Sequence, residues 1–439
     1  MKYKSLIKFG VLLIVGYQGY AFIVNFSSSE QNTDKIRFAS LAWQEQSIQA
    51  NKEIVSEWNR ANPDRNVEYI QGSWNSIYDY LITSFETEVV PDVFHYESSI
   101  IVDFANRGYL KDLAPLISNE MKKDIVDVAW SSVTSPSGEI SGIPFMLESF
   151  IILYNKEIFD NNDIIPPSKE NPWTWDNVKT VGTQLTQDTN GDGIIDQWGT
   201  AMGLRNSANF ILNHSISFGG SFFKIEDGKY VVRVGDEEKA LLKIIIEMNR
   251  DLKCLAPESI GKNVTEILSG FMQGRYAMIL GMGNWSRQQL IENAPNNFNW
   301  GVLPAPIGKY SRSGINSQTF SIPQKSKKQK DAFDFIEFAL NSKNMAKLAY
   351  SDWMIPTRKS CMEMPQFNTL DDGWKIVTSS VDDLTVGPWL GAPGYVEWKG
   401  RVANPILQEL FAGRLSIEEA SKRIEFESNL VLSRYQKDK

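Results

Sequence analysis

The stretch GIPFMLESFIILYNKEIF, residues 142–159, contains the point at which the chain is expected to pass from one lobe to the next. Residues 150–154 form a run of aromatic, Ile and Leu side chains, which predicts a buried strand over residues 150–155. Residues 142–145 precede this strand, and Glu148 lies in the crossover that follows Phe145. Strands and helices alternate before the stretch and resume within it, so we expect a second α/β lobe to begin here.

Before this point the chain predicts one complete α/β unit. Apolar residues at helical or strand spacing, with breaks at proline and glycine, define each element. The expected strands are residues 35–42, 66–71 and 91–94, and the expected helices are residues 48–62, 77–85 and 99–108. Alternation of this kind predicts a mostly parallel sheet.

After this point the same alternation predicts a second unit without a separate tail domain. The expected strands are residues 276–280 and 301–303, and the expected helices are residues 175–185, 238–252, 331–340, 405–411 and 416–435.

Composition and charge exclude several classes of function. The chain has 439 residues, 42% hydrophobic and 22% charged, which suits two packed lobes. A net charge of −8 provides no basic field for nucleic acid. The only histidines, His95 and His214, and the only cysteines, Cys254 and Cys361, leave few groups for catalysis or His/Cys metal sites. The protein is expected not to be an enzyme and to need no organic cofactor, and the cysteines form either one disulfide or two free thiols.

The N-terminus indicates export. Lys2, Lys4 and Lys8 precede an apolar run over residues 9–26 and a polar stretch over residues 27–34. The run is either a cleaved signal, with small residues at positions 19 and 21, or a membrane anchor. We therefore expect a periplasmic or otherwise extracytoplasmic protein. Because no cysteine lies near the run, we expect that it is not a lipoprotein.

Several short strings occur together in a specific order. They are PDV at residues 91–93, GIPF at 142–145, LYNKEIF at 153–159, PWTW at 172–175, GRYAM at 274–278 and LPAP at 303–306. From about residue 36 to 432 the chain resembles extracellular solute-binding protein family 1, which includes maltose-binding protein.

This resemblance implies the two-lobed periplasmic-binding-protein fold, an α/β fold with discontinuous lobes, a hinge and a ligand cleft between the lobes. Residues 1–33 are then an export signal or anchor plus a linker. Lobe one comprises residues 34–146 and 312–360, and lobe two comprises residues 147–311 and 361–439. The resemblance also implies a monomer that closes around a sugar and delivers it to the permease subunits of an ABC importer.

Aromatic residues make up 12% of the chain, with 13 Trp, 15 Tyr and 23 Phe. Indole and phenol rings stack on the C–H faces of sugars, and carboxylates and amides bind sugar hydroxyls. Ligands in open α/β sheets lie beyond strand ends, so residues that follow predicted strands are candidates, and the resemblance adds Glu148 and Trp285. The expected ligand-binding residues are Trp43, Gln44, Trp74, Tyr96, Glu97, Phe145, Glu148, Trp285, Trp389 and Tyr395.

Each candidate has a structural alternative. A tryptophan is as often a core residue as a ligand platform, and Trp74 is balanced between the two. Glu97 and Glu148 either bind ligand or make structural or solvated contacts. Four tryptophans are assigned to packing, namely Trp58, Trp130, Trp175 and Trp198. Three arginines either grip an acidic sugar or lie at the surface, namely Arg205, Arg287 and Arg358.

Residues 188–196, DTNGDGIID, match the first nine positions of an EF-hand calcium loop. The oxygens would come from Asp188, Asn190, Asp192, the Ile194 carbonyl and Asp196. Gly199 stands at position 12 in place of the bidentate glutamate. Similar loops hold structural calcium in sugar-binding members of the family, including alginate-binding ones. The alternative is an Asx-turn held by its own side chains.

The leading hypothesis is an oligosaccharide-binding protein, with either a neutral or a uronate-containing ligand. One alternative is a surface glycan sensor or adhesion protein with the same fold. The enzymatic alternative, a glycoside hydrolase or lyase, would use Glu97 and Glu148 as paired carboxylates.

Overall fold

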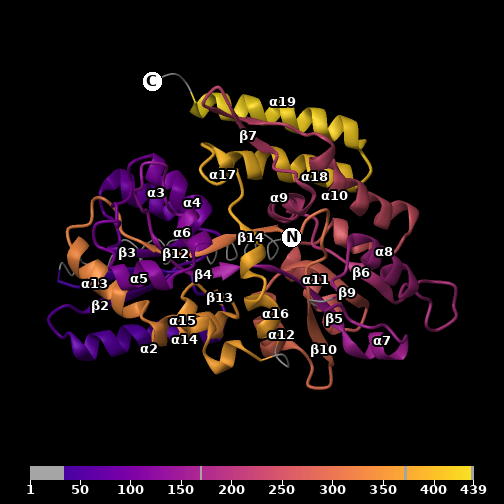
Figure 1. The fold of residues 1–439 in the computed structure, drawn as a ribbon, viewed down its shortest axis with the longest axis horizontal. Coiled ribbons are helices and arrows are strands. Elements are labelled where there is room, and N and C mark those ends of the chain that lie inside the picture. The colour runs from indigo at the N-terminus through magenta and orange to yellow at the C-terminus, as the bar shows by residue number, and fades with distance from the viewer. Residues whose placement is uncertain (1–33, 169–170, 370–372, 437–439) are drawn as a thin grey trace, which may run out of the picture.

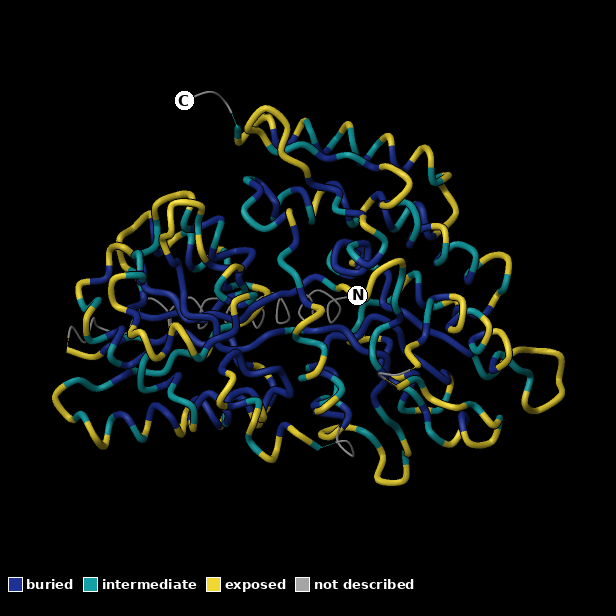
Figure 2. Tube along the Cα trace, in the orientation of Figure 1, coloured by how far each residue is buried: buried dark blue, intermediate teal, exposed yellow. Residues whose placement is uncertain are grey.

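The computed structural model describes residues 34–168, 171–369 and 373–436. Within them the chain forms two mixed sheets, each covered by helices (Figure 1). Most strands of the two main sheets are deeply buried (Figure 2), whereas β7 is mostly exposed. The predicted signal or anchor, residues 1–33, lies outside the described residues. No helix among the described residues is long and apolar enough to cross a membrane.

The first lobe contains a six-stranded sheet in the order β13-β4-β12-β3-β1-β2. Its strands are β1 (Ile36–Ser40), β2 (Val67–Gln71), β3 (Val93–Glu97), β4 (Ile143–Glu148), β12 (Asn316–Ser321) and β13 (Ile355–Pro356). Its helices are α2 (Glu45–Ala61), α3 (Ile77–Thr87), α4 (Ser98–Asn106), α5 (Asn119–Asp124), α6 (Asp127–Ser131), α13 (Gln329–Ala339), α14 (Ser342–Asp352) and α15 (Lys359–Met362).

The second lobe contains a four-stranded sheet in the order β10-β5-β9-β6 and a hairpin, β7-β8. Its strands are β5 (Phe150–Asn155), β6 (Trp198–Ala201), β7 (Phe223–Glu226), β8 (Lys229–Val232), β9 (Tyr276–Gly283) and β10 (Trp300–Pro304). Its helices are α7 (Lys156–Asn161), α8 (Trp175–Gln184), α9 (Ala208–Ser215), α10 (Asp236–Ile246), α11 (Val264–Met272), α12 (Ser286–Asn293), α17 (Tyr395–Trp398), α18 (Asn404–Phe411) and α19 (Ile417–Tyr435).

Short helical turns complete the chain. The 3₁₀ turns are Ile216–Phe218, Pro257–Ile260, Pro365–Phe367 and Val381–Asp383, and the π-helical turns are Glu247–Asp251 and Lys399–Ala403. The last π turn continues α17 into α18, and α18 and α19 lie together above the second lobe in Figure 1.

Local sequence accounts for the best-predicted elements. β5 is buried along nearly its whole length, as its apolar sequence requires. Thr174 and Asn177 form a capping box that starts α8, and Ser416 and Glu419 do the same for α19.

The expectation of a mostly parallel sheet in the first lobe holds only for β1 with β2 and β3. β12 is antiparallel to β3 and β4, and β13 is antiparallel to β4. In the second lobe β5 is antiparallel to both β9 and β10. β4, which the sequence pattern did not identify as a strand, ends at Glu148, and only Ser149 separates it from β5. The chain therefore passes straight from one sheet into the other instead of returning through a crossover helix.

Three chain segments join the lobes. The first is Ser149, and the second runs from β10 through β11 (Ser313–Gly314) to β12. The third follows α15 and includes α16 (Trp374–Thr378) and β14 (Leu384–Thr385). β11 pairs in parallel with β14, so two of the three connecting segments are bonded to each other.

The cysteines are two free, buried thiols. Cys361 lies in the core that contains the first sheet, and Cys254 lies in the core formed mainly by second-lobe helices. The disulfide alternative is therefore excluded in this structure.

Candidate ligand-binding site

Polar residues from three neighbouring strands of the first sheet meet at one edge. β3 ends at Glu97 and β4 ends at Glu148. β12 runs antiparallel between them and begins at Asn316, which is opposite Glu148. Antiparallel pairing brings the start of β12 beside the ends of its neighbours. The Asn316 amide nitrogen donates a hydrogen bond of 2.8 Å to Oε2 of Glu97.

The second lobe contributes Trp285, directly after β9. Its indole nitrogen donates a hydrogen bond of 2.9 Å to Oε1 of Glu148. Gly283 makes room for this contact, because a Cβ there would lie 2.2 Å from the indole nitrogen and 2.4 Å from the carboxylate oxygen.

Trp43 and Gln44 follow β1 and reach the same second-lobe segment. The rings of Trp43 and Trp285 meet edge to face, with centroids 5.5 Å apart. The Gln289 side chain on α12 donates a hydrogen bond of 2.9 Å to Oε1 of Gln44. Gln44 in turn donates to the Asp352 carboxylate at the end of α14. We call the region defined by Trp43, Glu97, Glu148, Trp285 and Lys399 the lobe junction.

Lys399 completes the lobe junction from the C-terminal part of the chain. Its ammonium nitrogen lies 3.8 Å from Oε1 of Glu97 and 5.5 Å from the centre of the Tyr395 ring. Burial alone would lower the pKa of Lys399, but Glu97, Tyr395 and Glu148 outweigh it, so the pKa is raised and the side chain stays charged.

The pKa values of Glu148 and Asp352 are both raised well above their usual range. Burial raises the pKa of Glu148 to about 7, and the charge of Glu97 adds to the effect, against the hydrogen bond from Trp285. Burial raises the pKa of Asp352 to about 6, although the hydrogen bond from Gln44 opposes it.

Trp74 and Tyr96 lie together in the first lobe. Trp74 is 37% exposed and packs edge to face against Tyr96, with centroids 5.8 Å apart. The same indole packs against His95 with centroids 6.1 Å apart. Trp74 is therefore an accessible aromatic surface supported by two buried rings.

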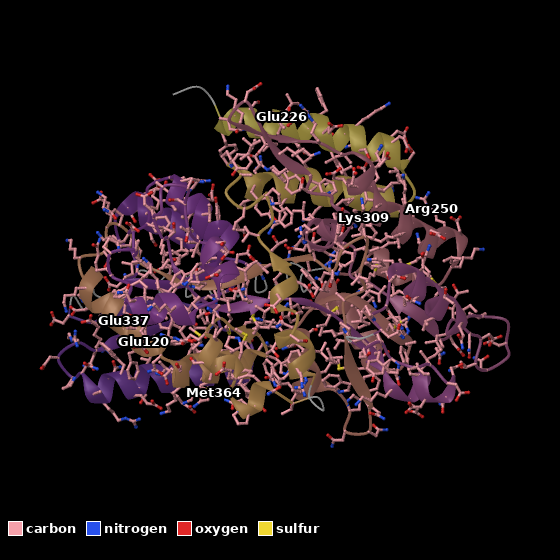
Figure 3. The ribbon with its side chains drawn as sticks, viewed as in Figure 1. Glu120, Glu226, Arg250, Lys309, Glu337 and Met364 are labelled. Carbon is pink, nitrogen blue, oxygen red and sulfur yellow. The ribbon has the colours of Figure 1, made fainter. Side chains whose placement is uncertain are left out.

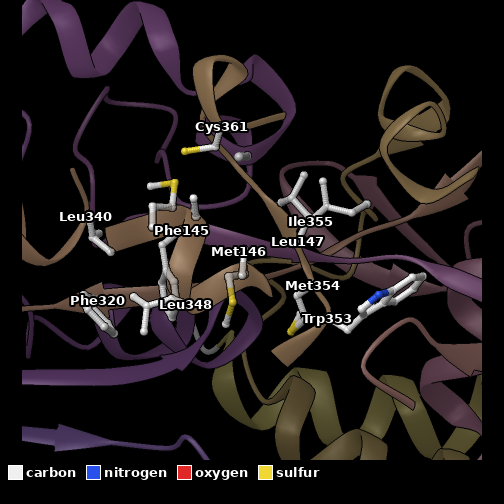
Figure 4. Packing of buried hydrophobic residues seen from close by; sticks show 14 of the residues in the cluster. Phe145, Met146, Leu147, Phe320, Leu340, Leu348, Trp353, Met354, Ile355 and Cys361 are labelled. Carbon is white, nitrogen blue, oxygen red and sulfur yellow. The ribbon is translucent and has the colours of Figure 1, made fainter. Parts of the chain in front are cut away.

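Three expected ligand-binding residues are buried in hydrophobic cores in this structure, and their role in ligand binding stays a prediction. Phe145 packs against Phe320, with ring centroids 4.5 Å apart, inside the first-lobe core (Figure 4). Trp389 is 3% exposed and belongs to the second-lobe core. Tyr395 is also 3% exposed, stacks on Trp398 and lies beneath Lys399. Tyr395 packs edge to face against Phe223, with ring centroids 6.2 Å apart, and Trp389 belongs to the same core, so both rings are buried in this structure.

Sequence reasoning missed Asn316, Lys399, Gln289 and Asp352. Asn316 opens the strand NSQTFS, whose polar residues are all buried, and that unusual combination was the available signal. Lys399 is one of many lysines, and only the fold brings it to Glu97. Two further buried polar atoms near the lobe junction, Oγ of Ser149 and Nδ2 of Asn284, have no hydrogen-bond partner among the described residues.

The residues assigned to packing mostly pack. Trp58 and Trp175 are buried, and Trp130 and Trp198 pack against the core with part of their surface exposed. Arg358 is buried and pairs with Asp124 at 3.0 Å. The other two arginines also have partners: Arg205 pairs with Glu266 at 2.9 Å, and Arg287 lies over Trp300 and Trp353.

The histidines are buried structural groups. Burial lowers the pKa of His95 to about 4 and that of His214 to about 3, so both are neutral near pH 7. His95 accepts the backbone N–H of Leu41 at 3.2 Å and contacts the Gln318 amide at 2.9 Å. It connects β1, β3 and β12 beneath Trp74.

The expected calcium loop is closed by its own hydrogen bonds. The Asp188 carboxylate accepts the amides of residues 191, 192 and 193, at 2.7, 3.2 and 2.6 Å. Oδ1 of Asp196 accepts from the Thr189 backbone and hydroxyl at 3.0 and 2.8 Å. Three His, Cys, Asp or Glu side chains do not gather for a metal anywhere in the described residues. This arrangement is the Asx-turn alternative, and calcium binding stays a prediction.

Comparison with known proteins agrees with this architecture. Residues 42–346 match the bacterial extracellular solute-binding protein family, and the chain belongs to it. An uncharacterized lipoprotein in the oleD 5′ region of Streptomyces antibioticus is 36% identical over 387 residues, covering 88% of this chain and 84% of that protein. The diacetylchitobiose binding protein DasA of Streptomyces coelicolor is 24% identical over 381 residues, covering 83% of this chain and 82% of that protein.

A solved structure has the same fold. It is an ABC substrate-binding protein of Listeria monocytogenes in complex with cycloalternan, with a TM-score of 0.75 and 20% identity. The match covers 91% of this chain and 98% of that one. The two-lobed fold and the solute-binding family predicted from the residue strings are confirmed.

One expectation on location is contradicted. The Streptomyces antibioticus relative is a lipoprotein, which conflicts with our expectation that this protein is not one. That expectation depended on the lack of a cysteine near the N-terminal apolar run, and this is too weak an argument against a relative that aligns over 88% of the chain. The extracytoplasmic location itself agrees with the extracellular family.

Proposed function

We propose that this protein binds an oligosaccharide at the lobe junction and delivers it to the membrane subunits of an ABC importer. The observation that carries the proposal is the meeting of Trp43 and Trp285, from different lobes, beside Glu97 and Glu148. Aromatic planes suit the C–H faces of a sugar ring, and the carboxylates and Asn316 suit its hydroxyls.

Opening of the lobes would make this site accessible. Trp43 touches Trp285 directly, and Gln44 bonds Gln289, so a sugar must separate these pairs to lie between them. Ser149 is the whole connection between β4 and β5, and β11 pairs with β14 alongside, which makes these segments the proposed hinge. Ligand contacts made only when both lobes approach would favour the closed form, which is what a transporter recognises.

The relatives support a carbohydrate ligand. DasA binds diacetylchitobiose, and the Listeria monocytogenes structure holds cycloalternan. We propose that the protein acts as a monomer, without catalysis, and that residues 1–33 direct it out of the cytoplasm. The neutral, buried histidines agree with the absence of acid–base chemistry at those positions.

Titration with a panel of purified oligosaccharides, followed by tryptophan fluorescence and calorimetry, tests the proposal. We expect saturable binding of at least one glycan and a smaller radius of gyration in solution on binding. Trp285→Ala should weaken that binding by about tenfold or more, because a buried aromatic contact contributes well over 1 kcal/mol.

Two outcomes would contradict the proposal. Binding only of amino acids, polyamines or metal ions would exclude the carbohydrate assignment. Release of new reducing ends from the bound glycan would instead indicate an enzyme that uses Glu97 and Glu148, and Glu148→Gln would then abolish product formation.

A further inference from the structure

The lobe junction contains two carboxylates and one ammonium group. Glu97 lies 3.8 Å from Lys399 and also accepts hydrogen bonds from Ser99, at 3.0 Å, and Asn316, at 2.8 Å. Glu148 accepts the indole N–H of Trp285 and acts electrostatically on both Glu97 and Lys399. The groups that interact with Glu148 include one cation, Lys399, and the same lysine also interacts with Glu97.

No second cation among the described residues balances this group. α17 contributes Tyr395, whose pKa is raised by burial to about 12, so its hydroxyl stays neutral. β12 contributes the amide Asn316, α4 contributes the hydroxyl of Ser99, and the segment after β9 contributes Trp285. When all three ionisable groups are charged, the lobe junction carries one excess negative charge.

An uncompensated buried charge is unfavourable, and the molecule can relieve it in two ways. Glu148 can take up a proton, which agrees with its raised pKa. Alternatively, a ligand can bring a second positive charge.

We infer that the lobe junction selects saccharides that carry a protonated amine over the matched neutral saccharides, with the ammonium group placed between Glu97 and Glu148. The inference depends on the proposed sugar-binding function and adds the class of sugar. An ammonium group donates three hydrogen bonds in a compact geometry, which suits two carboxylates that both interact with the ammonium group of Lys399. A metal ion fits less well, because the described residues contain no group of three metal-ligating carboxylate, imidazole or thiol side chains.

The test compares pairs of ligands that differ only in charge. Calorimetric titration at pH 7 would use β-1,4-linked glucosamine di- and trisaccharides and their N-acetylated counterparts, together with a panel of other neutral oligosaccharides. We expect the amine form to bind at least about tenfold more tightly, because hydrogen bonds between charged groups exceed neutral ones by more than 1 kcal/mol.

Two isosteric variants should move the amine preference in opposite directions. Glu148→Gln keeps the shape and removes one negative charge, so the ratio of amine to neutral affinity should fall towards one. Lys399→Met removes the competing cation, so the ratio should rise above that of the wild type. Glu120→Gln, an exposed carboxylate on α5, should leave the ratio unchanged (Figure 3).

The outcomes separate this inference from the proposed function. Neutral oligosaccharides that bind as tightly as the amine form, or more tightly, overturn the amine selectivity and leave sugar binding intact. An amine preference that persists unchanged in both variants also overturns it, because the carboxylates would not be its source. A failure of every saccharide in the panel to bind would reject the proposed function itself.

Discussion

At the scale of single residues, position relative to strand ends decides what a side chain does. Glu97 and Glu148 are the last residues of β3 and β4, the two strands that flank β12, and β12 begins at Asn316 between them. Phe145, only three residues before Glu148, points into the core, where it contacts His95 and Phe320 (Figure 4). The alternation of side chains along a strand therefore separates ligand candidates from core residues within one short segment.

Glu148→Gln should change how stability depends on pH. Burial and Glu97 raise the pKa of Glu148 from 4.5 to about 7, so the folded protein holds this proton more tightly than the unfolded chain does. The stabilisation from this tightly held proton is fully present at low pH and is lost as pH rises from about 4.5 to about 7. The free energy of unfolding therefore falls by up to about 3 kcal/mol over this range. The variant should lack this loss, as measured by urea unfolding between pH 4 and 8.

The comparison isolates Glu148 from other groups. Asp352, whose pKa is raised by burial to about 6, produces a similar fall in both proteins and cancels in the difference. For Glu120→Gln, the free energy of unfolding should depend on pH as it does in the wild type. If Glu148→Gln also showed the same pH dependence as the wild type, the raised pKa of Glu148 would be contradicted.

At the scale of elements, connections matter more than the strands themselves. β4 and β5 are both apolar, but the single residue between them places them in different sheets. The loop of residues 188–196 shows the same dependence on local chemistry, because its aspartates hold the turn through backbone amides and Gly191 and Gly193 have positive φ angles of 77° and 88°. The backbone conformation of this loop therefore follows from its sequence, whereas the sequence does not show whether the loop binds an ion.

The calcium prediction belongs to this loop. If calcium binds, adding millimolar calcium should raise the melting temperature of the wild-type protein, because a ligand that binds only the folded state stabilises it. Asp192→Asn removes one loop carboxylate and should abolish most of that rise, as measured by calorimetry with and without chelator. Magnesium serves as the matched ion control. An identical melting temperature with calcium and with chelator would support the Asx-turn alternative.

At the scale of the whole molecule, one continuous core joins the two sheets. It contains Ile143 and Phe145 from β4, Leu153 from β5 and Val302 from β10. The segment after α15 strengthens the connection, since Trp374 packs on Trp353, with centroids 4.5 Å apart, and on Phe367, at 4.8 Å. Gly373 adopts a φ of 77°, which lets α16 begin directly against Val302.

Trp374→Ala should destabilise the whole protein. The side chain is 1% exposed and surrounded by aromatic rings, so truncation leaves a large cavity. We expect a loss of about 3–5 kcal/mol in the free energy of unfolding. Trp74→Ala, at an exposed indole, should cost less than about 1 kcal/mol in the same denaturant titration. Equal losses in the two variants would contradict the role assigned to Trp374.

Much of the fold could be predicted without coordinates. The predicted strand over residues 150–155 coincides with β5, and predicted helices such as residues 175–185 and 416–435 agree with α8 and α19 to within a residue. β4 was missed because Pro144 and Glu148 interrupt its apolar pattern. The predicted lobe boundaries are not tested, although β4 and β5 change sheets close to the predicted position.

The α/β elements, the solute-binding family and the candidate residues next to strand ends could be predicted from the sequence, because periodicity and motifs are local properties of the chain. Which of these candidates lie together became visible with the folded chain. It brought Trp43 to Trp285 and Lys399 to Glu97, and it buried Trp389 and Tyr395 in the second-lobe core. The physical reason is that contacts between residues hundreds of positions apart, and the charge balance that follows from them, depend on how the lobes pack.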